Sequence, residues 1–412
     1  MQTQVTIIGA GIVGICCALS LRDRGHPVRL LDRGEPGQET SYGNAGVISP
    51  WSIIPQPVPG IWKKIPGMMF GDQRPLAVRA AFWPRMIPWG MRFLRHANEE
   101  SLRSAADAME YLCAPSVELY RRHLAGTGHE DLVVDSSYLH AFRQADRADL
   151  KALDYRIRIE KGGDLELMGS DTLRRLEPGL SREFKAAVAI KGQARARAPG
   201  RIAQVLADKA RGLGVEIIRT EVKGLARSGE GWEISTDQGP LHAERVVLAA
   251  GVWSEPLLRG LGFRLPLVAE RGYHVEFAAP QAELNNSVMD VDAKIVASSM
   301  LGGLRVAGSA EFASPDAPPD PRRQALLTRQ ARAICPDLDT TSPSFWMGRR
   351  PSLPDSLPVL GQIDGQPGLF GAFGHSHHGL MMAPKTGEVL ADILSGKRLN
   401  HDISAFSAQR FA

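Results

Sequence analysis

The pattern of apolar and polar positions predicts that the chain begins with a strand, a helix and a second strand. Val5 to Ile8 is an unbroken apolar run, a longer apolar stretch of helical length follows, and Val28 to Leu31 is a second short apolar run that ends at Asp32. Short apolar runs on both sides of a helix are typical of buried parallel strands. The first part of the chain therefore predicts a βαβ unit.

Further along, the pattern predicts a second α/β region that is interrupted by an antiparallel one. Val246 to Gly251 predicts another buried strand that ends in a small-residue turn, and Leu369 to Phe373 predicts a strand that runs into a glycine-containing turn. Between Pro266 and Pro336 apolar and polar residues alternate, as in antiparallel strands. Helices are predicted at 99–129, 144–161, 173–180, 201–213 and 380–395. The fold class is therefore α/β plus antiparallel β.

The segment from Trp51 to Gly90 shows no regular period. It holds many prolines together with Trp and Met residues, so we expect irregular structure here. Its apolar side chains form either a surface for a partner or a membrane, or a cover over the core or over a substrate channel. The sequence leaves both interpretations open.

Three glycines lie where the first strand meets the first helix, with the spacing Gly-x-Gly-x-x-Gly. Gly9 allows a tight turn, Gly11 lets the backbone approach a pyrophosphate, and Gly14 lets the helix pack closely on the sheet. The helix N-terminus then presents free N–H groups and the positive end of its dipole. Asp32 closes the second strand, where a carboxylate can accept hydrogen bonds from both hydroxyls of an adenosine ribose. These residues predict a dinucleotide site, for NAD or for FAD.

Composition favours a globular enzyme that does not bind nucleic acid. The 412 residues carry 49 Lys and Arg against 45 Asp and Glu, a net charge of +4 without a basic tract. The four cysteines form no Cys-x-x-Cys motif, which fits a reducing compartment without zinc or disulfides. No basic residue precedes the apolar run Val5 to Leu21 and no small-residue cleavage site follows it, so we expect no signal peptide and no membrane-spanning helix. We expect a soluble, cytoplasmic protein.

Seven sequence blocks, in order and at suitable spacing, are similar to the motifs of one family. They are GAGIVG at 9–14 with Asp32, ETSYGNAG at 39–46, LEPGLS at 176–181, VVLAAGVWS at 246–254, ERGYH at 270–274, MGRRPSLPDSLPVLG at 347–361 and GHSHHGLMMAPKTG at 374–387. Over nearly its whole length the chain resembles the D-amino acid oxidase superfamily of flavoproteins, most closely its D-amino acid dehydrogenase branch. The resemblance implies a Rossmann-like FAD-binding domain of residues 1–50, 196–265 and 345–412, and an antiparallel-sheet substrate-binding domain of residues 51–195 and 266–344.

The same resemblance implies FAD rather than NAD, bound without a covalent link. Cys335 does not fall in the motif through which the sarcosine oxidases attach their flavin. The cofactor-binding residues that the resemblance implies are Gly9, Ala10, Gly11, Ile12, Val13, Gly14, Asp32, Arg33, Thr40, Ser41, Gly43, Asn44, Ala45, Gly46, Val47, Val222, Ala250, Gly251, Gly348, Gly374, His375, Gly379, Leu380 and Met381.

On the substrate side the resemblance points to three residues. Arg350 falls on the family's carboxylate-binding arginine, and a guanidinium fork suits both oxygens of a carboxylate. Tyr273 matches a tyrosine that helps to hold this carboxylate, and His377 stands where glycine oxidase-like relatives carry an arginine. Without the family, Arg350 would be read as a surface ion pair and Tyr273 as a half-buried strand aromatic. No metal is expected at the histidines of 375–378, because no acidic or cysteine partner is evident in that turn.

The reaction that the resemblance implies is oxidation of a D-amino acid by hydride transfer from Cα to flavin N5. The imino acid product is then hydrolysed to a 2-oxo acid and ammonia. Electrons would pass to a quinone or another acceptor, and residues 51–90 would touch the inner face of the membrane. Two alternatives stay open: an enzyme for D-proline, hydroxyproline or another secondary amine, and an FAD-bearing subunit of a larger dehydrogenase complex. Because the dehydrogenase branch feeds membrane quinones and residues 51–90 offer a membrane surface, we expect a dehydrogenase rather than an oxidase, although the sequence does not identify the electron acceptor.

Overall fold

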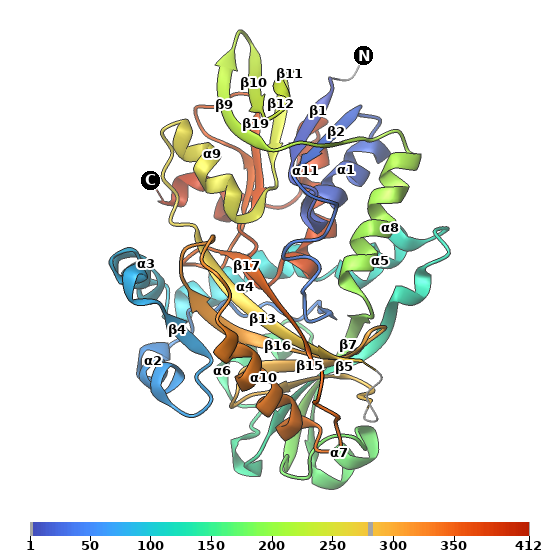
Figure 1. The fold of residues 1–412 in the computed structure, drawn as a ribbon, viewed down its shortest axis with the longest axis vertical. Coiled ribbons are helices and arrows are strands. Elements are labelled where there is room, and N and C mark those ends of the chain that lie inside the picture. Colours follow the sequence, from blue (N-terminus) through green and yellow to red (C-terminus); the bar gives the residue numbers. More distant parts are fainter. Residues whose placement is uncertain (1–2, 279–282, 412) are drawn as a thin grey trace.

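Two large sheets organise the computed structural model, which describes residues 3–278 and 283–411 (Figure 1). Residues 279–282 of the predicted antiparallel stretch lie outside the described residues. One sheet, drawn at the top of Figure 1, carries the N-terminal βαβ unit, and the other fills the lower half.

The upper sheet has six strands in the order β18–β19–β12–β1–β2–β8. Their bounds are Val5–Ile8 (β1), Val28–Asp32 (β2), Glu216–Arg219 (β8), Arg245–Leu248 (β12), Val359–Gln362 (β18) and Leu369–Phe373 (β19). β1 lies between β2 and β12 and pairs in parallel with both, and only the pair of β18 and β19 is antiparallel. The predicted βαβ unit is confirmed.

Three long helices cover this sheet, namely α1 (Ile12–Asp23), α8 (Pro199–Gly212) and α11 (Gly379–Leu394), and they share one apolar core with it. α11 packs directly on α1, because a Cβ added at Gly387 would lie 2.5 Å from the carbonyl oxygen of Cys16. A three-stranded antiparallel sheet lies beside the six-stranded one, made of β9 (Val222–Ser228), β10 (Gly231–Thr236) and β11 (Gly239–Ala243).

The lower sheet has ten strands, eight of them in the order β17–β13–β16–β15–β14–β5–β7–β3, with β4 beside β16 and β6 beside β7. The bounds are Val47–Ile48 (β3), Leu76–Val78 (β4), Val133–Phe142 (β5), Leu165–Gly169 (β6), Ala186–Ala196 (β7), Val268–Phe277 (β13), Ser287–Asp290 (β14), Ile295–Met300 (β15), Gly303–Phe312 (β16) and Ser344–Ser352 (β17). Helix α10 (Pro321–Ile334) covers one face through a shared apolar cluster (Figure 1). The predicted antiparallel sheet is confirmed, with two parallel pairs in it. Strand β17 crosses the predicted domain boundary at residue 345, and the boundaries stay a prediction.

The expectation of irregular structure at 51–90 is wrong for much of the segment. It contains α2 (Ile61–Phe70) and the start of α3 (Trp83–Arg95), drawn at the left of Figure 1. Proline does not prevent these helices: Pro84 stands in the first turn of α3, where its missing N–H costs little. Pro66 lies inside α2 and Pro88 inside α3, where the buried side chains of Met86 and Trp89 hold the helix in place despite its proline.

The remaining helices are shorter than the periodicity predicts. Pro115 separates α4 from α5, so the helix predicted at 99–129 is two helices, and the charged stretch 144–161 becomes an α-helix only at Leu153. The bounds are Glu99–Cys113 (α4), Ser116–Leu124 (α5), Leu153–Glu160 (α6), Ser170–Leu176 (α7) and Ser254–Gly260 (α9), with short 3₁₀ turns at 80–82, 130–132, 145–147, 251–253, 404–406 and 408–411. Among the described helices, none has the length and apolarity needed to cross a bilayer.

Candidate active site

A cavity of about 1100 Å³ is lined by residues of both large sheets. Its walls include almost every residue that the sequence predicts as cofactor-binding or catalytic. The exceptions are Ala10, Gly14 and Gly46. Segments that lie far apart in the sequence therefore meet at one place.

The glycine turn after β1 leaves no room for side chains. Gly9 has a φ of +112°, and a Cβ there would lie 2.5 Å from the carbonyl oxygen of Ala249. A Cβ on Gly14 would lie 1.9 Å from the carbonyl oxygen of Gly9. This close packing holds the N-terminus of α1 against the edge of the sheet, where Gly11, Ile12 and Val13 line the cavity. The N–H of Ile12 donates to Ser41 Oγ at 3.0 Å.

Asp32 fastens the glycine turn to the end of β2. Its two carboxylate oxygens accept hydrogen bonds from the N–H of Ala10, at 2.6 Å, and of Gly34, at 2.8 Å. Burial raises the pKa of Asp32, and both N–H donors oppose that shift by stabilising the charged form. Asp32 lines the cavity next to Arg33, whose guanidinium lies 4.1 Å from the ring of Trp253. The Asp32 carboxylate at this end of the cavity suits the hydroxyl groups of an adenosine ribose.

The loop at 40–47 forms a backbone wall of the cavity and is held from several sides. Arg305 donates to the carbonyl oxygens of Tyr42 and Asn44, at 2.9 and 2.8 Å. Thr40 donates to the carbonyl oxygen of Arg349 at 2.8 Å. A Cβ on Gly43 would lie 1.8 Å from the ring of Trp346, so only glycine fits there. The loop is therefore held in place along the cavity.

Helix α11 begins at the cavity without a side-chain cap. Its first residues, Gly379 to Met381, line the cavity, so free N–H groups and the positive end of the helix dipole lie there. Nearby, burial lowers the pKa values of His375 and His378 to about 3, which keeps both side chains neutral at pH 7. His375 Nε2 lies 3.0 Å from the hydroxyl of Thr386, which is a residue of α11. The turn therefore presents the positive end of a helix dipole to an anionic ring, while His375 and His378 add no charge.

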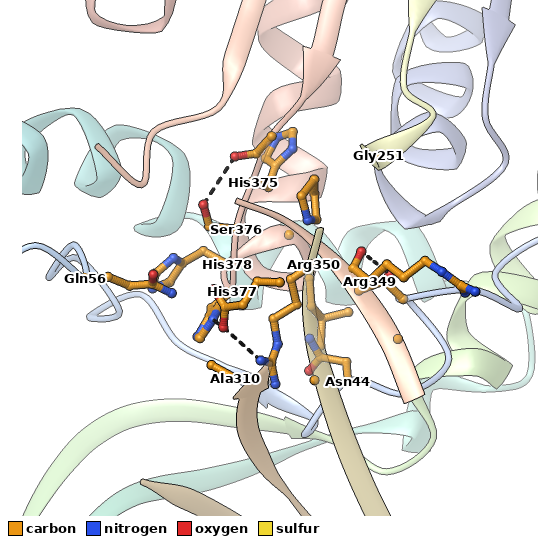
Figure 2. A pocket seen from close by; sticks show the side chains of 18 of the residues that line it. Asn44, Gln56, Gly251, Ala310, Arg349, Arg350, His375, Ser376, His377 and His378 are labelled. Atoms are coloured by element: carbon orange, nitrogen blue, oxygen red, sulfur yellow. Dashed lines mark hydrogen bonds and ion pairs between the residues drawn. The ribbon is translucent and has the colours of Figure 1, made fainter. Parts of the chain in front are cut away.

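Arg350 and His377 meet at a buried carboxylate that the sequence analysis did not single out. Glu270 Oε1 lies 3.0 Å from Arg350 Nη1 and 2.5 Å from His377 Nε2, and its Oε2 accepts a hydrogen bond from Ser352 at 2.9 Å. Figure 2 shows the side chains of Arg350 and His377 converging on this part of the cavity. Burial alone would raise the pKa of Glu270, but His377 and Arg350 lower it to about 2.

The guanidinium of Arg350 is placed by its neighbours on the sheet. Arg350 is opposite Glu270 on β13, and its Nη1 also donates to the carbonyl oxygen of Ser309 at 2.9 Å. A Cβ on Gly272 would lie 2.2 Å from both Cζ and Nη2, so the guanidinium lies flat over this glycine. Among the described residues, Nε and Nη2 of Arg350 have no hydrogen-bond partner. This edge is free for a carboxylate.

Tyr273 borders the cavity, but its ring and hydroxyl lie on the other face of the same strand. Side chains alternate along β13, so Glu270 and Gly272 face the site while Tyr273 faces α10. Its ring stacks on Phe345, and its hydroxyl bonds Glu311. The structure brings Arg350 and His377 together but does not bring the Tyr273 hydroxyl to them, so a substrate role for Tyr273 stays a prediction. Arg349 extends away from Arg350 (Figure 2), with Nε bonded to the carbonyl oxygen of Pro315 at 2.6 Å.

Two functional candidates escaped the sequence analysis. Glu270 lies in the ERGYH block, within a buried strand. A charged residue at a buried position needs a partner, and this signal could have marked Glu270 as a functional candidate. Lys294, in the turn before β15, lines the cavity without belonging to any recognised block. No sequence pattern marks it, because its place depends on the pairing of distant strands.

The comparisons with known proteins agree with this geometry. The model of the DAO family, described as FAD dependent oxidoreductase, matches residues 4–393. The chain belongs to this family. It is 35% identical to a D-amino-acid oxidase of Bradyrhizobium diazoefficiens, with 99% of each chain covered. It is 31% identical to a D-amino acid dehydrogenase of Rhizorhabdus wittichii, over 96% of this chain and 97% of the relative.

Solved structures give the same fold. A glycine oxidase of Geobacillus kaustophilus superposes with a TM-score of 0.76 at 23% identity, over all of both chains. An L-proline dehydrogenase of P. horikoshii gives 0.74 at 19% identity, over 100% of this chain and 98% of the other. At these identities the likeness concerns the fold alone. The predicted superfamily, the fold class and FAD as the cofactor are confirmed.

The residues that line the cavity suit FAD. A glycine turn with no room for a Cβ and the N-terminus of α1 suit the pyrophosphate. The second helix N-terminus, that of α11, suits the flavin pyrimidine end, which becomes negative on reduction. The enzyme is an FAD-dependent oxidoreductase.

Proposed function

We propose that this enzyme oxidises a D-amino acid to the imino acid, which water then converts to a 2-oxo acid and ammonia. The observation that carries the proposal is the free edge of the Arg350 guanidinium, which faces a cavity built for a flavin. The names of the relatives, D-amino-acid oxidase and D-amino acid dehydrogenase, supply the stereochemistry. Within this family FAD, when bound, supplies the two-electron oxidation of the substrate's Cα–N bond.

The chain's own residues bind and orient the substrate in this proposal. Arg350 takes the α-carboxylate on Nε and Nη2, because Nη1 is already used by Glu270 and Ser309. Glu270 fixes the plane of the guanidinium and holds His377 beside it. Orientation of this kind lowers the barrier by placing the Cα–H bond before reaction.

Substitution of Arg350 by methionine tests the proposal. We expect anaerobic reduction of the enzyme by D-amino acids to need a much higher substrate concentration, since a charge-assisted carboxylate pair is lost. Arg349→Met is the matched control, because its side chain points away from the site. If Arg350→Met and the wild type have the same KM and turnover, Arg350 does not bind the substrate.

For the electron acceptor we propose a membrane quinone, reached through α2 and α3. Both helices line the cavity and also carry exposed apolar side chains: Trp62 is 60% exposed, Phe70 75% and Ile87 57%. Exposed basic residues stand beside them, at Lys63, Lys64, Arg85, Arg92 and Arg95. A mixture of apolar and basic side chains is typical of helices that lie on an anionic membrane surface. Dehydrogenase is therefore preferred to oxidase in this proposal.

A further inference from the structure

Lys294 stands in a tight turn that places its side chain at the cavity. The turn joins β14 to β15, and Lys294 adopts a φ of +56°, which is rare for a residue with a side chain. Asp290 Oδ1 accepts the N–H groups of Asp292 and Ala293, at 3.0 and 3.1 Å. The other oxygen of this buried carboxylate pairs with Arg143 at 2.6 Å. The turn is therefore rigidly held, and its strain is supported by the fold.

The side chain of Lys294 faces the cavity and not the core. The next residue, Ile295, is buried in the cluster under α10, whereas Lys294 is one of the residues that line the cavity. The side chain is accessible and lines the cavity, yet burial, with a smaller contribution from Lys64, lowers its pKa. Lys294 is therefore an exposed cation that borders the cavity which the substrate would enter.

The charges around Lys294 leave it without a neutralising partner. The carboxylates that face it are Asp154 and Asp292, and each is already paired, the first with Arg158 at 3.1 Å and the second with Arg147. Lys64 and Arg147 add further positive charge. In the part of the chain that the structure describes, Lys294 Nζ forms no ion pair.

Strand register connects Lys294 with Arg350. Ile295 on β15 pairs with Gly308 on β16, and the following residue of β16, Ser309, accepts the hydrogen bond of Arg350 Nη1. Lys294 therefore leaves the backbone one strand away from the carbonyl that holds the guanidinium, a spacing of about 5 Å. A ligand that contacts Arg350 with one end extends along the same face of the sheet toward Lys294.

We propose that Lys294 is a second carboxylate subsite, which makes D-amino acids with an acidic side chain the preferred substrates. The inference rests on the proposed function, because Arg350 must take the α-carboxylate. D-Aspartate and D-glutamate carry their second carboxylate one or two methylenes beyond Cα. A neutral side chain would leave the ammonium of Lys294 desolvated and unpaired once the cavity is filled, which is unfavourable.

The test compares D-glutamate with D-glutamine, which has the same shape without the charge. Anaerobic reduction of the purified holoenzyme gives kcat/KM for each. We expect the wild type to prefer D-glutamate by at least about tenfold, Lys294→Met to lose most of this preference, and Lys294→Arg to retain it. Equal use of both substrates by the wild type, or an equal loss for both in Lys294→Met, would overturn the proposal.

A binding measurement separates this proposal from turnover. Glutarate and its monoamide are titrated into the oxidised holoenzyme while the visible flavin spectrum is followed. We expect tighter binding of glutarate in the wild type, and similar binding of the two in Lys294→Met. Equal binding in the wild type contradicts the subsite even if the variant does not fold. If no D-amino acid of any class reduces the flavin while glutarate still binds preferentially, the proposed function fails and the subsite stands.

Discussion

The guanidinium of Arg350 lies flat over Gly272, on the neighbouring strand. A Cβ at this glycine would come within 2.2 Å of Arg350 Cζ. Gly272→Ala is therefore expected to displace the guanidinium and to raise KM for amino acid substrates by about tenfold or more, the equivalent of about 1.4 kcal/mol. Steady-state kinetics with D-amino acids measures this.

Gly224→Ala is the control for this change, because a Cβ on that strand residue meets nothing within 4 Å. Flavin content should stay near one per chain in both variants, since neither glycine belongs to the dinucleotide turn. An unchanged KM in Gly272→Ala would mean that the substrate does not depend on the position of Arg350.

The carboxylate of Glu270 is expected to stabilise the fold at neutral pH. Its pKa is lowered from 4.5 to about 2, so the charged form is favoured in the folded state. The stabilisation is complete above the unfolded value and is lost as pH falls from about 4.5 toward about 2. Replacing Glu270 by glutamine should cost about 3 kcal/mol at pH 7, because the buried charge of Arg350 loses its partner.

Urea unfolding of the wild type and Glu270→Gln across this pH range measures the difference in the free energy of unfolding. The difference should be constant above pH 5 and should shrink in acid. A difference that stays the same down to pH 3 would show that Glu270 is not ionised through its contacts with Arg350 and His377.

Retention of FAD is expected to depend on Gly14. A Cβ there would lie 1.9 Å from the carbonyl oxygen of Gly9, so Gly14→Ala must separate α1 from the glycine turn. We expect the dissociation constant of FAD to rise by at least about tenfold. The ratio of visible flavin absorbance to protein after gel filtration reports it, and a ratio equal to that of the wild type would argue against the pyrophosphate site.

Tyr273→Phe separates a packing role from a substrate role. The hydroxyl donates a hydrogen bond to Glu311 and accepts one from the N–H of Asp320 at 3.2 Å. Burial and the hydrogen bond to Glu311 raise the pKa of Tyr273 to about 12. We expect a loss of about 1–3 kcal/mol in the free energy of unfolding, because Glu311 loses a buried donor, and little change in KM. A KM that rises as in Arg350→Met would instead assign the hydroxyl to the substrate carboxylate.

Membrane contact through α2 and α3 is tested with lipid vesicles. Replacing Trp62 and Phe70 by serine removes two large exposed apolar side chains without opening the core. We expect co-sedimentation with vesicles that contain anionic lipid to fall several-fold, and binding of the wild type to weaken with salt. Leu213→Ser, an exposed apolar residue beyond α8, is the control. Equal sedimentation of both variants would exclude this surface.

Much of the cofactor site could be predicted because its requirements are local. Gly9, Gly11 and Gly14 have fixed spacing in one turn, and Asp32 is the last residue of a strand that pairs with the first. The free helix ends of α1 and α11 were also predictable, since each follows a strand and a glycine-containing turn. Such features depend on neighbours in the sequence.

The substrate end depends on contacts that no local pattern encodes. Glu270 and Arg350 are 80 residues apart and meet through strand register, and Tyr273 was assigned without knowing which face of β13 it occupies. In the segment at 51–90, proline content argued against helices, but packing of Met86 and Trp89 on Val268 and Phe312 outweighs it. Here tertiary contacts decide, and the sequence order does not reveal them.

The close contact between α1 and α11 has a consequence for the folding of the chain. Cys16 and Cys17 on α1 are fully buried, and the carbonyl oxygen of Cys16 would lie 2.5 Å from a Cβ on Gly387. The core around α1 is therefore complete only when segments far apart in the sequence have met. Contacts of such long sequence separation slow folding, so we expect this apolar core to form late.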